Sequence, residues 1–394
     1  MPKQQKLTLI LLLFNIFIPF MGIGLITPIM PTLMNELGIS GTVVGYLTAV
    51  FALSQLICSP ISGKATDKIG RKKILVLGLF LFGFSELLFG LGQKIETLFL
   101  ARIFGGISSA MIMPAVTAFI ADITSLAERP KAMGYMAAII NTGFIIGPGI
   151  GGFLAEYGTR APFFVAAGFG AGAGLLSLVF LKEPERPIAD NEKIPPLKMS
   201  IKRILVPMYL IAFSLILIAS FGISTFESFF SLYVDHKFGF SPKEIALVIT
   251  IGSVLGALLQ AVVFKHLVEL WQEIKLIRYS LMLAGVLIYL VTIVHSYGWI
   301  LLVTTISFVG FDLFRPAVTS FLSKHAGDEQ GFLGGMNSMF TSIGNIFGPV
   351  LGGVLFDINI DYPYYFAMVV VVIGAIITLF WNEPSDFLYN ERSV

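Results

Sequence analysis

"GFIIGPGIGG", from Gly143 to Gly152, returns 201 residues later as "GNIFGPVLGG", from Gly344 to Gly353. The same offset holds downstream, where "PFFVA" at 162 matches "PYYFA" at 363. Upstream it drifts by one residue, where "PAVTAFIADI" at 114 matches "PAVTSFLSKH" at 316. The chain therefore contains two copies of one apolar unit, and its fold has to accommodate both.

The composition is that of a membrane protein. Of the 394 residues, 56% are hydrophobic and 13% are charged, whereas a soluble domain carries about 25% charged residues. The mean hydropathy is +0.87. The formal net charge of +2 comes without a continuous basic face, which argues against a nucleic-acid partner. The single cysteine, Cys58, lies in an apolar run, so a disulfide framework is excluded.

A spanning helix needs about 20 mostly apolar residues, and the sequence contains twelve such stretches. The first stretch begins in "MPKQQKLTLILLLFNIFIPF" and is much longer than a signal-peptide core of about 7–15 residues, so we expect it to be kept as a helix. The predicted spans are 7–34, 42–62, 74–92, 97–121, 133–155, 162–181, 206–234, 243–264, 276–294, 299–322, 332–355 and 363–381.

The longest break between spans is a polar, proline-containing stretch, Lys182 to Arg203. It predicts a linker at 182–204 between an N-terminal six-helix half, 1–181, and a C-terminal half, 205–394. Because an even number of helices precedes the second copy, both copies have the same orientation. The predicted fold is an all-α multi-pass membrane protein with twelve transmembrane helices in two parallel six-helix repeats. Such folds place a substrate site near the membrane midplane and alternate its access by rocking.

The loop charges predict the orientation. Of the 26 basic residues, twenty fall on the side of the termini, four on the opposite side and two, Arg102 and Arg315, inside helices. Cytoplasmic loops carry the excess of Lys and Arg, so we expect both termini in the cytoplasm.

Between the second and third spans stands "GKATDKIGRKK", from Gly63 to Lys73. Asp67 and Arg71 are four residues apart, which suits a local ion pair, and Gly63 and Gly70 allow a tight turn. This loop resembles a motif of the major facilitator superfamily, in which it latches one conformational state. The alternative is a positive-inside anchor, a role that the basic residues serve in either case.

Two further motifs resemble the same superfamily. "LFLARIFGGISSA" carries Arg102, which is either part of the coupling machinery and latch or a side chain that extends to the membrane surface. "GFIIGPGIGG" resembles the antiporter motif of exporters, formed by Gly143, Gly147, Pro148, Gly151 and Gly152. The glycines at four-residue spacing form a ridge for close helix contact, and Pro148 removes a backbone donor and bends the helix.

The resemblance extends over nearly the full chain to bacterial drug:proton antiporters of the NorA/Bmr type. It is carried by "YMAAIINTGFIIGPGIGGFLAE", "SFGISTFESFFSLY" and "GFDLFRPAVT". It implies multidrug efflux of hydrophobic and cationic compounds, energised by proton influx across a bacterial plasma membrane. The coupling ion would be the proton, with no other cofactor, and the functional unit a monomer.

Four acidic residues fall inside predicted helices: Glu86, Asp122, Glu227 and Asp312. A charge at the bilayer centre costs about 2.5–3.5 kcal/mol on insertion scales, so such residues usually face a cavity or a partner. We expect Asp122 to cap its helix or pair with the Gly63–Lys73 loop. We expect Glu86 to be an interhelical hydrogen-bonding residue, with a functional role as the alternative.

Glu227, Asp312 and Arg315 are the predicted proton-coupling residues. Their equivalents in the first copy are the uncharged Ile26, Ala110 and Met113, so the shared fold does not need the charges. Arg315, one turn from Asp312, favours its ionised form, whereas Glu227 has no basic neighbour on its own helix. The alternative is a purely structural Asp–Arg pair.

The drug site is expected to be apolar and aromatic with few polar groups. Resemblance and repeat position give Phe20, Phe51, Gln55, Met113, Asn141, Phe144, Gln260, Phe308, Phe311 and Asn337.

Three other classes are less well supported. A metabolite importer of the same fold would carry more charged groups in the N-terminal half, and a receptor would not need two six-helix copies. A membrane enzyme needs convergent nucleophiles or metal ligands, whereas the four histidines lie at loops or helix ends. Glycine-rich phosphate loops are absent from the sequence, so ATP is not expected to be the energy source.

Overall fold

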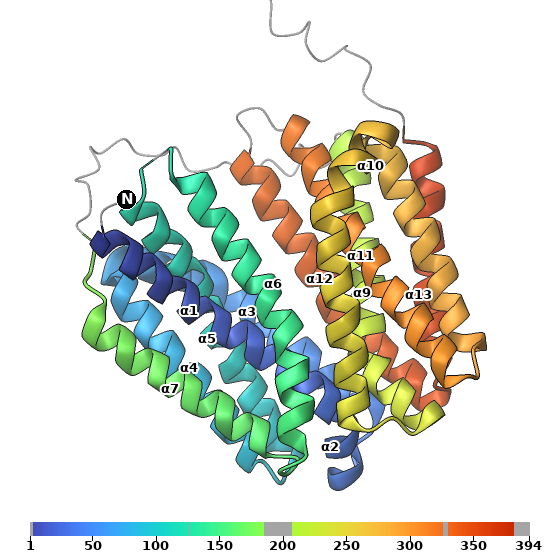
Figure 1. Cartoon of the computed structure of the whole chain (residues 1–394), viewed down its shortest axis with the longest axis horizontal. Helices are drawn as coiled ribbons and strands as arrows, with labels where there is room; N and C mark the ends of the chain where they lie inside the picture. The colour runs from blue at the N-terminus through green and yellow to red at the C-terminus, as the bar shows by residue number, and fades with distance from the viewer. Residues whose placement is uncertain (1–2, 126, 185–206, 326–329, 382–394) are drawn as a thin grey trace, which may run out of the picture. The chain divides into compact units, whose positions relative to one another are not determined.

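A computed structural model describes residues 3–125, 127–184, 207–325 and 330–381, and some side chains within these ranges lie outside the description. These residues form helices and no strands, which confirms the predicted all-α architecture. Figure 1 shows them in chain order. They are α1 Lys3–Ile26, η1 Thr27–Ile29, α2 Met30–Leu37, α3 Gly41–Ile69, α4 Arg71–Leu91, α5 Ile95–Ile123, α6 Arg129–Ala155, α7 Ala161–Phe180, α9 Pro207–Phe238, α10 Pro242–Ile293, α11 Tyr297–His325, α12 Gln330–Ile358 and α13 Tyr362–Leu379.

Membrane insertion explains why the chain is helical throughout. The bilayer core offers no water to the backbone, so each spanning segment must satisfy its own N–H and C=O groups. Ten helical segments in the described part of the chain are long and apolar enough to cross a membrane. The two other predicted spans correspond to the first part of α10 and to α11.

Two predicted spans are interrupted or bounded by irregular backbone. The first span, predicted as 7–34, consists of α1, the short η1 turn, which contains Pro28, and α2. The eighth and ninth spans, predicted as 243–264 and 276–294, lie on either side of a non-helical residue in α10, Gln272, where φ is 62° and ψ is 164°.

The described contacts divide the chain into two compact units. The first unit holds α1 to α7 together with residues 230–250, which are the end of α9 and the start of α10. The second unit holds the rest of α9 to α13. The predicted halves, 1–181 and 205–394, stay a prediction, and most of the predicted linker lies outside the described residues.

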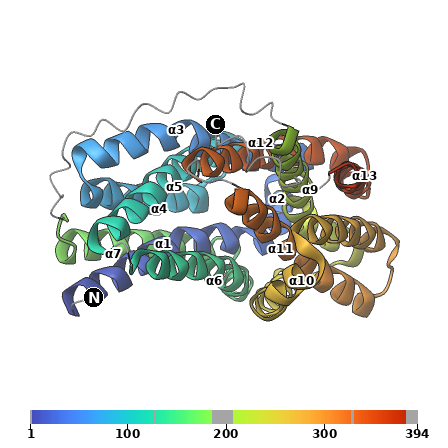
Figure 2. The same cartoon turned by 90° about the horizontal axis from the view of Figure 1, so that it is seen from above.

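In the first unit, α1, α4 and α5 supply the core. Leu12, Ile16 and Phe119 are fully or almost fully buried there, and Phe82 from α4 packs beside them. α4 packs on α5 and α7, α3 packs on α5, and α6 packs on α1. Figures 1 and 2 show α6 running along α1. Many apolar side chains point outward, for example Val179 and Phe180 at the end of α7, as expected of a surface that faces lipid.

Candidate functional site

The loop between α3 and α4 is organised by Arg71, the first residue of α4. Its Nη1 lies 3.0 Å from Asp67 Oδ1 and donates to the carbonyl oxygen of Thr66 at 3.0 Å. Its Nε donates to Oδ2 of Asp122, near the end of α5, at 2.9 Å. The predicted pair of Arg71 with Asp67 is therefore present, and Asp122, expected to cap its helix or to pair with this loop, pairs with the loop through Arg71. The latching role of Gly63, Asp67, Arg71 and Arg102 stays a prediction.

The two glycines of this loop behave differently. Gly70 has φ 127° and ψ 149°, a conformation that side-chain-bearing residues avoid, and it forms the turn between α3 and α4. Gly63 lies inside α3, and a β-carbon there would meet nothing within 4 Å. The predicted turn at Gly63 is thus wrong, because α3 remains helical to Ile69 and the whole reversal occurs at Gly70.

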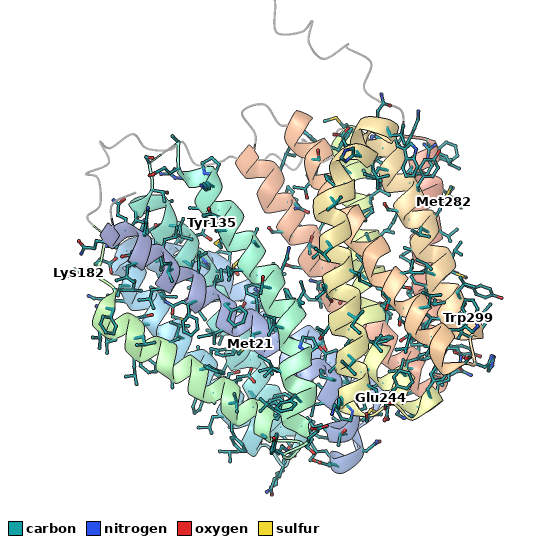
Figure 3. All side chains as sticks on the ribbon, in the orientation of Figure 1. Met21, Tyr135, Lys182, Glu244, Met282 and Trp299 are labelled. Atoms are coloured by element: carbon teal, nitrogen blue, oxygen red, sulfur yellow. The ribbon has the colours of Figure 1, made fainter. Side chains whose placement is uncertain are left out.

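A residue that the sequence analysis missed completes this loop. The carboxylate of Glu183, just beyond α7, accepts from the backbone N–H of Arg71 at 2.5 Å and of Lys72 at 3.0 Å. The first N–H groups of a helix have no partner within the helix, and the helix dipole favours an anion there. Glu183 therefore caps α4 from 112 residues away in the sequence. Neighbouring Lys182 is labelled in Figure 3.

The glycine motif of α6 brings its backbone against α1. A β-carbon on Gly143 would lie 3.0 Å from the nitrogen of Met21, and one on Gly147 would lie 2.5 Å from the Met21 carbonyl oxygen. Gly151 meets Leu25 in the same way. Met21 is labelled in Figure 3. The predicted ridge of small residues is confirmed as a helix-packing surface, and Pro148 lies buried within it.

The second unit repeats this contact with α12 and α9. A β-carbon on Gly344 would lie 2.8 Å from the nitrogen of Phe221, and one on Gly348 would lie 2.8 Å from the Phe221 carbonyl oxygen. Gly352 faces the ring of Phe229. The 201-residue sequence repeat is thus also a repeat of helix packing.

The last glycine of the motif faces a different helix. A β-carbon on Gly152 would meet Ala246 and the carbonyl oxygen of Pro242, both in the first turns of α10. One turn further along, Glu156 Oε1 accepts from Lys243 Nζ at 2.8 Å. The end of α6 is therefore joined to the start of α10 by a close backbone approach and an ion pair.

Two predicted drug-binding residues, Phe20 and Phe144, are in contact in the first unit, and a third, Gln55, bonds α5. The rings of Phe20 on α1 and Phe144 on α6 meet edge to face, with centroids 5.2 Å apart. Gln55 on α3 donates from Nε2 to Ser109 Oγ on α5 at 2.9 Å.

The other predicted drug-binding residues are placed singly or not at all. Phe51 and Met113 are half-buried and Asn141 is exposed, and in the second unit Asn337 is half-buried. The side chains of Gln260, Phe308 and Phe311 lie outside the described residues. Their part in a drug site stays a prediction.

The predicted proton-coupling residues are described only in part. Glu227 lies on α9 with an exposed side chain. Asp312 and Arg315 lie on α11, but their side chains are outside the described residues. Their grouping is accordingly still a sequence-based hypothesis.

Arg102 and Glu86 line the same small cavity inside the first unit. The guanidinium carbon of Arg102 lies 4.7 Å above the ring centre of Phe89, and its Nε is buried. Glu86 is 6% exposed, and its Oε2 has no hydrogen-bond partner, contrary to the interhelical hydrogen bond expected from the sequence.

Known proteins resemble this chain along its whole length. "Multidrug resistance protein 1" of Bacillus subtilis (strain 168) is 58% identical over 383 residues, which are 97% of this chain and 98% of that protein. "Quinolone resistance protein NorA" of Staphylococcus aureus (strain Mu50 / ATCC 700699) is 43% identical over 372 residues, 93% of this chain and 95% of that protein.

Solved structures show the same fold at low sequence identity. An inward-facing, unoccupied bacterial homologue of the human lysosomal transporter Spinster aligns with a TM-score of 0.81 at 16% identity and covers 98% of this chain and 100% of that one. The nucleoside transporter NupG aligns with a TM-score of 0.77 at 12% identity, covering 96% and 98%. The model of the Major Facilitator Superfamily matches residues 12–340 and 212–387. The duplicated helices and the paired glycine ridges described above agree with this match. The chain belongs to the Major Facilitator Superfamily.

Proposed function

We propose that this protein is a proton-coupled multidrug efflux transporter that exports hydrophobic and cationic compounds by alternating access. The observation that carries the proposal is the full-length similarity to two proteins named for drug resistance, at 58% and 43% identity. The glycine ridge of α6 against α1 supports it, since the sequence of that ridge resembles the antiporter motif of exporters. The protein would act as a monomer in a bacterial plasma membrane, with both termini in the cytoplasm.

The proposed cycle uses the charges of the second copy. In the outward-open state, Glu227 and Asp312 take up protons, and a cationic drug loses its counter-charge and leaves. In the inward-open state, the carboxylates release their protons to the cytoplasm and attract the next cation. Arg315 holds Asp312 while no drug is bound. The proton is the coupling ion.

The aromatic pair Phe20–Phe144 supports a drug site on the first unit. Aromatic faces bind flat apolar compounds and attract cations. The amide of Gln55 on α3, which bonds Ser109 on α5, is a polar group that can fix the orientation of a ligand. The pair lies on α1 and α6, the helices that the glycine ridge holds together.

The test is efflux of the fluorescent cation ethidium from cells that express the protein, with and without a protonophore. We expect wild-type efflux to stop when the protonophore collapses the proton gradient. Glu227→Gln and Asp312→Asn are expected to abolish gradient-driven efflux from membrane vesicles while the protein stays in the membrane. The control is Glu96→Gln, which removes an exposed carboxylate from the first turn of α5. Efflux that ignores the protonophore would contradict proton coupling, and wild-type transport by both variants would contradict the assigned residues.

A further inference from the structure

A small cavity inside the first unit contains two ionisable side chains that the proposed cycle does not use. It lies among α1, α3, α4 and α5, and its ionisable lining groups are Glu86 and Arg102. The centre of a water-sized sphere can move within about 10 Å³ of this cavity. That is room for about one water molecule.

Some polar groups that line this cavity have hydrogen-bond partners and others have none. Ser85 Oγ donates to the carbonyl oxygen of Ala101 at 3.1 Å, and Ser109 Oγ accepts from Gln55 at 2.9 Å. Glu86 Oε2 and Arg102 Nε have no hydrogen-bond partner. Both residues belong to the described range 3–125, and they form no ion pair with each other. The cavity thus separates a carboxyl group from a guanidinium group.

The surroundings stabilise the charge of Arg102 but not that of Glu86. Arg102 lies over the Phe89 ring at 4.7 Å, an arrangement that stabilises a cation. Glu86 is 6% exposed and is otherwise surrounded by apolar lining residues such as Phe82 and Ile23. A buried carboxyl group without a hydrogen bond is unfavourable in its ionised form unless a proton, a water molecule or a cation satisfies it. The cavity has room for such a small partner next to Glu86.

No other charged group lines the cavity. Of the helices packed around α4, α5 contributes Arg102, while the lining residues from α1 and α3 (Pro19, Ile23 and Phe51) do not titrate. α7 contributes no lining residue. The protonation of Glu86 therefore depends on Arg102 and on what enters the cavity.

The second copy shows that the fold does not require this pair. At the upstream offset of the repeat, the equivalents of Glu86 and Arg102 are Ile288 and Thr304, and both are fully buried. Thr304 satisfies its own hydroxyl by donating to the carbonyl oxygen of Ile300. Helix packing of this kind is therefore achieved without charge in one copy, while the other copy places a carboxyl and a guanidinium group there.

The cavity also adjoins the predicted drug-binding face. Phe51 lines it from α3, one helical turn before Gln55. A β-carbon on Gly105 would lie 3.2 Å from the Phe51 ring and 2.9 Å from Ser85 Oγ, so the glycine lets this ring approach the cavity wall. A ligand against Phe51 would change the access of water and protons to Glu86.

We propose that Glu86 is a proton-binding site of the first unit, which takes up and releases a proton beside Arg102 during transport. The proposal rests on the proposed function for its role in transport, but the binding of the proton is testable without it. The step is a proton transfer between water and the Glu86 carboxylate, and no bond other than O–H forms or breaks.

The first experiment measures the proton directly. Purified protein in lipid bilayers is titrated with acid and base while infrared spectroscopy follows the C=O stretch of protonated carboxyl groups. We expect a band that disappears as the pH rises in the wild type and in Glu96→Gln, and that is weaker in Glu86→Gln by the share of one carboxyl group, since Glu227 and Asp312 can contribute to the same band. An undiminished band in Glu86→Gln would overturn the proposal.

A second variant covers the case in which Glu86→Gln does not fold. Arg102→Gln keeps the carboxyl group but removes the nearby positive charge, which favours the ionised form. The band should then persist to higher pH than in the wild type. A band that titrates at the wild-type pH in Arg102→Gln would also overturn the proposal.

The second experiment links the site to transport. Purified protein in liposomes exports ethidium with and without an imposed pH gradient, and we expect Glu86→Gln to lose the stimulation by the gradient while Glu96→Gln keeps it. Full stimulation in Glu86→Gln would refute the transport role. If the wild type itself shows no stimulation, the proposed function fails, whereas the infrared band still decides whether Glu86 binds a proton.

Discussion

At the scale of single residues, the contacts where α4 begins converge on Arg71. Its side chain is 13% exposed and joins a half-buried acid, Asp122, at 19%, to an exposed one, Asp67, at 69%. Coulomb attraction strengthens as water is excluded. The two carboxylates therefore hold the same arginine with different strengths.

The first prediction compares these two acids. Asp122→Asn is expected to destabilise the protein by about 1–3 kcal/mol, because a half-buried charge-assisted hydrogen bond is weakened. Asp67→Asn is expected to cost at most about 1 kcal/mol, as for other exposed ion pairs. Thermal unfolding of the purified variants in detergent measures both. Equal shifts of the midpoint would contradict the assignment of Asp122 as the stronger partner.

The second prediction concerns the Glu183 cap. Glu183→Gln removes the negative charge from the start of α4, and Glu183→Ala also removes the acceptor. We expect Glu183→Ala to cost about 0.5–2 kcal/mol, the range found for helix caps. Glu183→Gln should cost less because its amide oxygen still accepts a hydrogen bond. Lys182→Gln is the control next to it. Thermal unfolding that is unchanged in Glu183→Ala would show that the cap does not contribute.

At the scale of helices, the paired contacts of α6 with α1 and of α12 with α9 follow from glycine spacing. Each ridge places its glycines four residues apart on one face. The lipid offers no hydrophobic driving force between helices, so close backbone approach has to supply the packing energy.

The third prediction tests this close approach. Gly147→Ala would place a methyl group 2.5 Å from the Met21 carbonyl oxygen, so the helices must separate. We expect a loss of about 1–3 kcal/mol, the usual cost of overpacking. Gly134→Ala is the matched control on the same helix, since a β-carbon there meets nothing within 4 Å. It should be neutral or stabilise α6 by up to about 1 kcal/mol. Thermal unfolding distinguishes the two, and similar midpoints would contradict the tight contact.

Sequence patterns predicted most of the elements but not all of their ends. Apolar length predicted the spans, and the 201-residue repeat predicted that both copies pack alike. The polar residues between 264 and 276 separated the eighth and ninth predicted spans, and the break in α10 at Gln272 lies among them. Gly63 was assigned to a turn because glycine tolerates one, but glycine also fits within a helix.

The candidate site was predictable where its members lie close in sequence or belong to a repeated motif. The Arg71–Asp67 pair follows from four-residue spacing. The Glu183 cap was not predictable, because its partners are more than a hundred residues away and no periodic signal links them. The missing hydrogen bond of Glu86 was also invisible, since it depends on which side chains surround the carboxyl group.

At the scale of the whole molecule, residues 230–250 belong to the first unit although they come from the second copy of the repeat. The glycine motif at the end of α6 provides their contact, with Gly152 against Ala246 and Glu156 bonded to Lys243. Any rocking motion that separates α6 from the start of α10 has to break this contact.

The fourth prediction therefore concerns Glu156 and Lys243. The hydrogen bond to Glu156 raises the pKa of Lys243. A raised pKa in the folded state means that the stabilisation is complete below the ordinary lysine value of about 10.4 and is lost only as the pH rises through the raised value. Lysine ionisation should thus leave this pair intact at neutral pH.

Replacing both residues by cysteine, Glu156→Cys with Lys243→Cys, allows the contact to be locked with a reducible cross-linker that joins two thiols across the length of the original side chains. Cross-linking of this double variant is expected to stop ethidium efflux, and reduction of the linker to restore it. Each single variant, Glu156→Cys and Lys243→Cys, serves as a control that the cross-linker should not affect. Continued efflux by the cross-linked protein would show that the contact does not open during transport.

The Glu183 cap also determines where the polypeptide can be divided. A first fragment that ends at Leu181 would lack the carboxylate that binds the N–H groups of Arg71 and Lys72, whereas one that ends beyond Pro184 would keep it. Two co-expressed fragments separated between residues 192 and 193, where the first of the two stretches of the first compact unit ends, should therefore assemble into a working transporter more readily than fragments separated after Leu181.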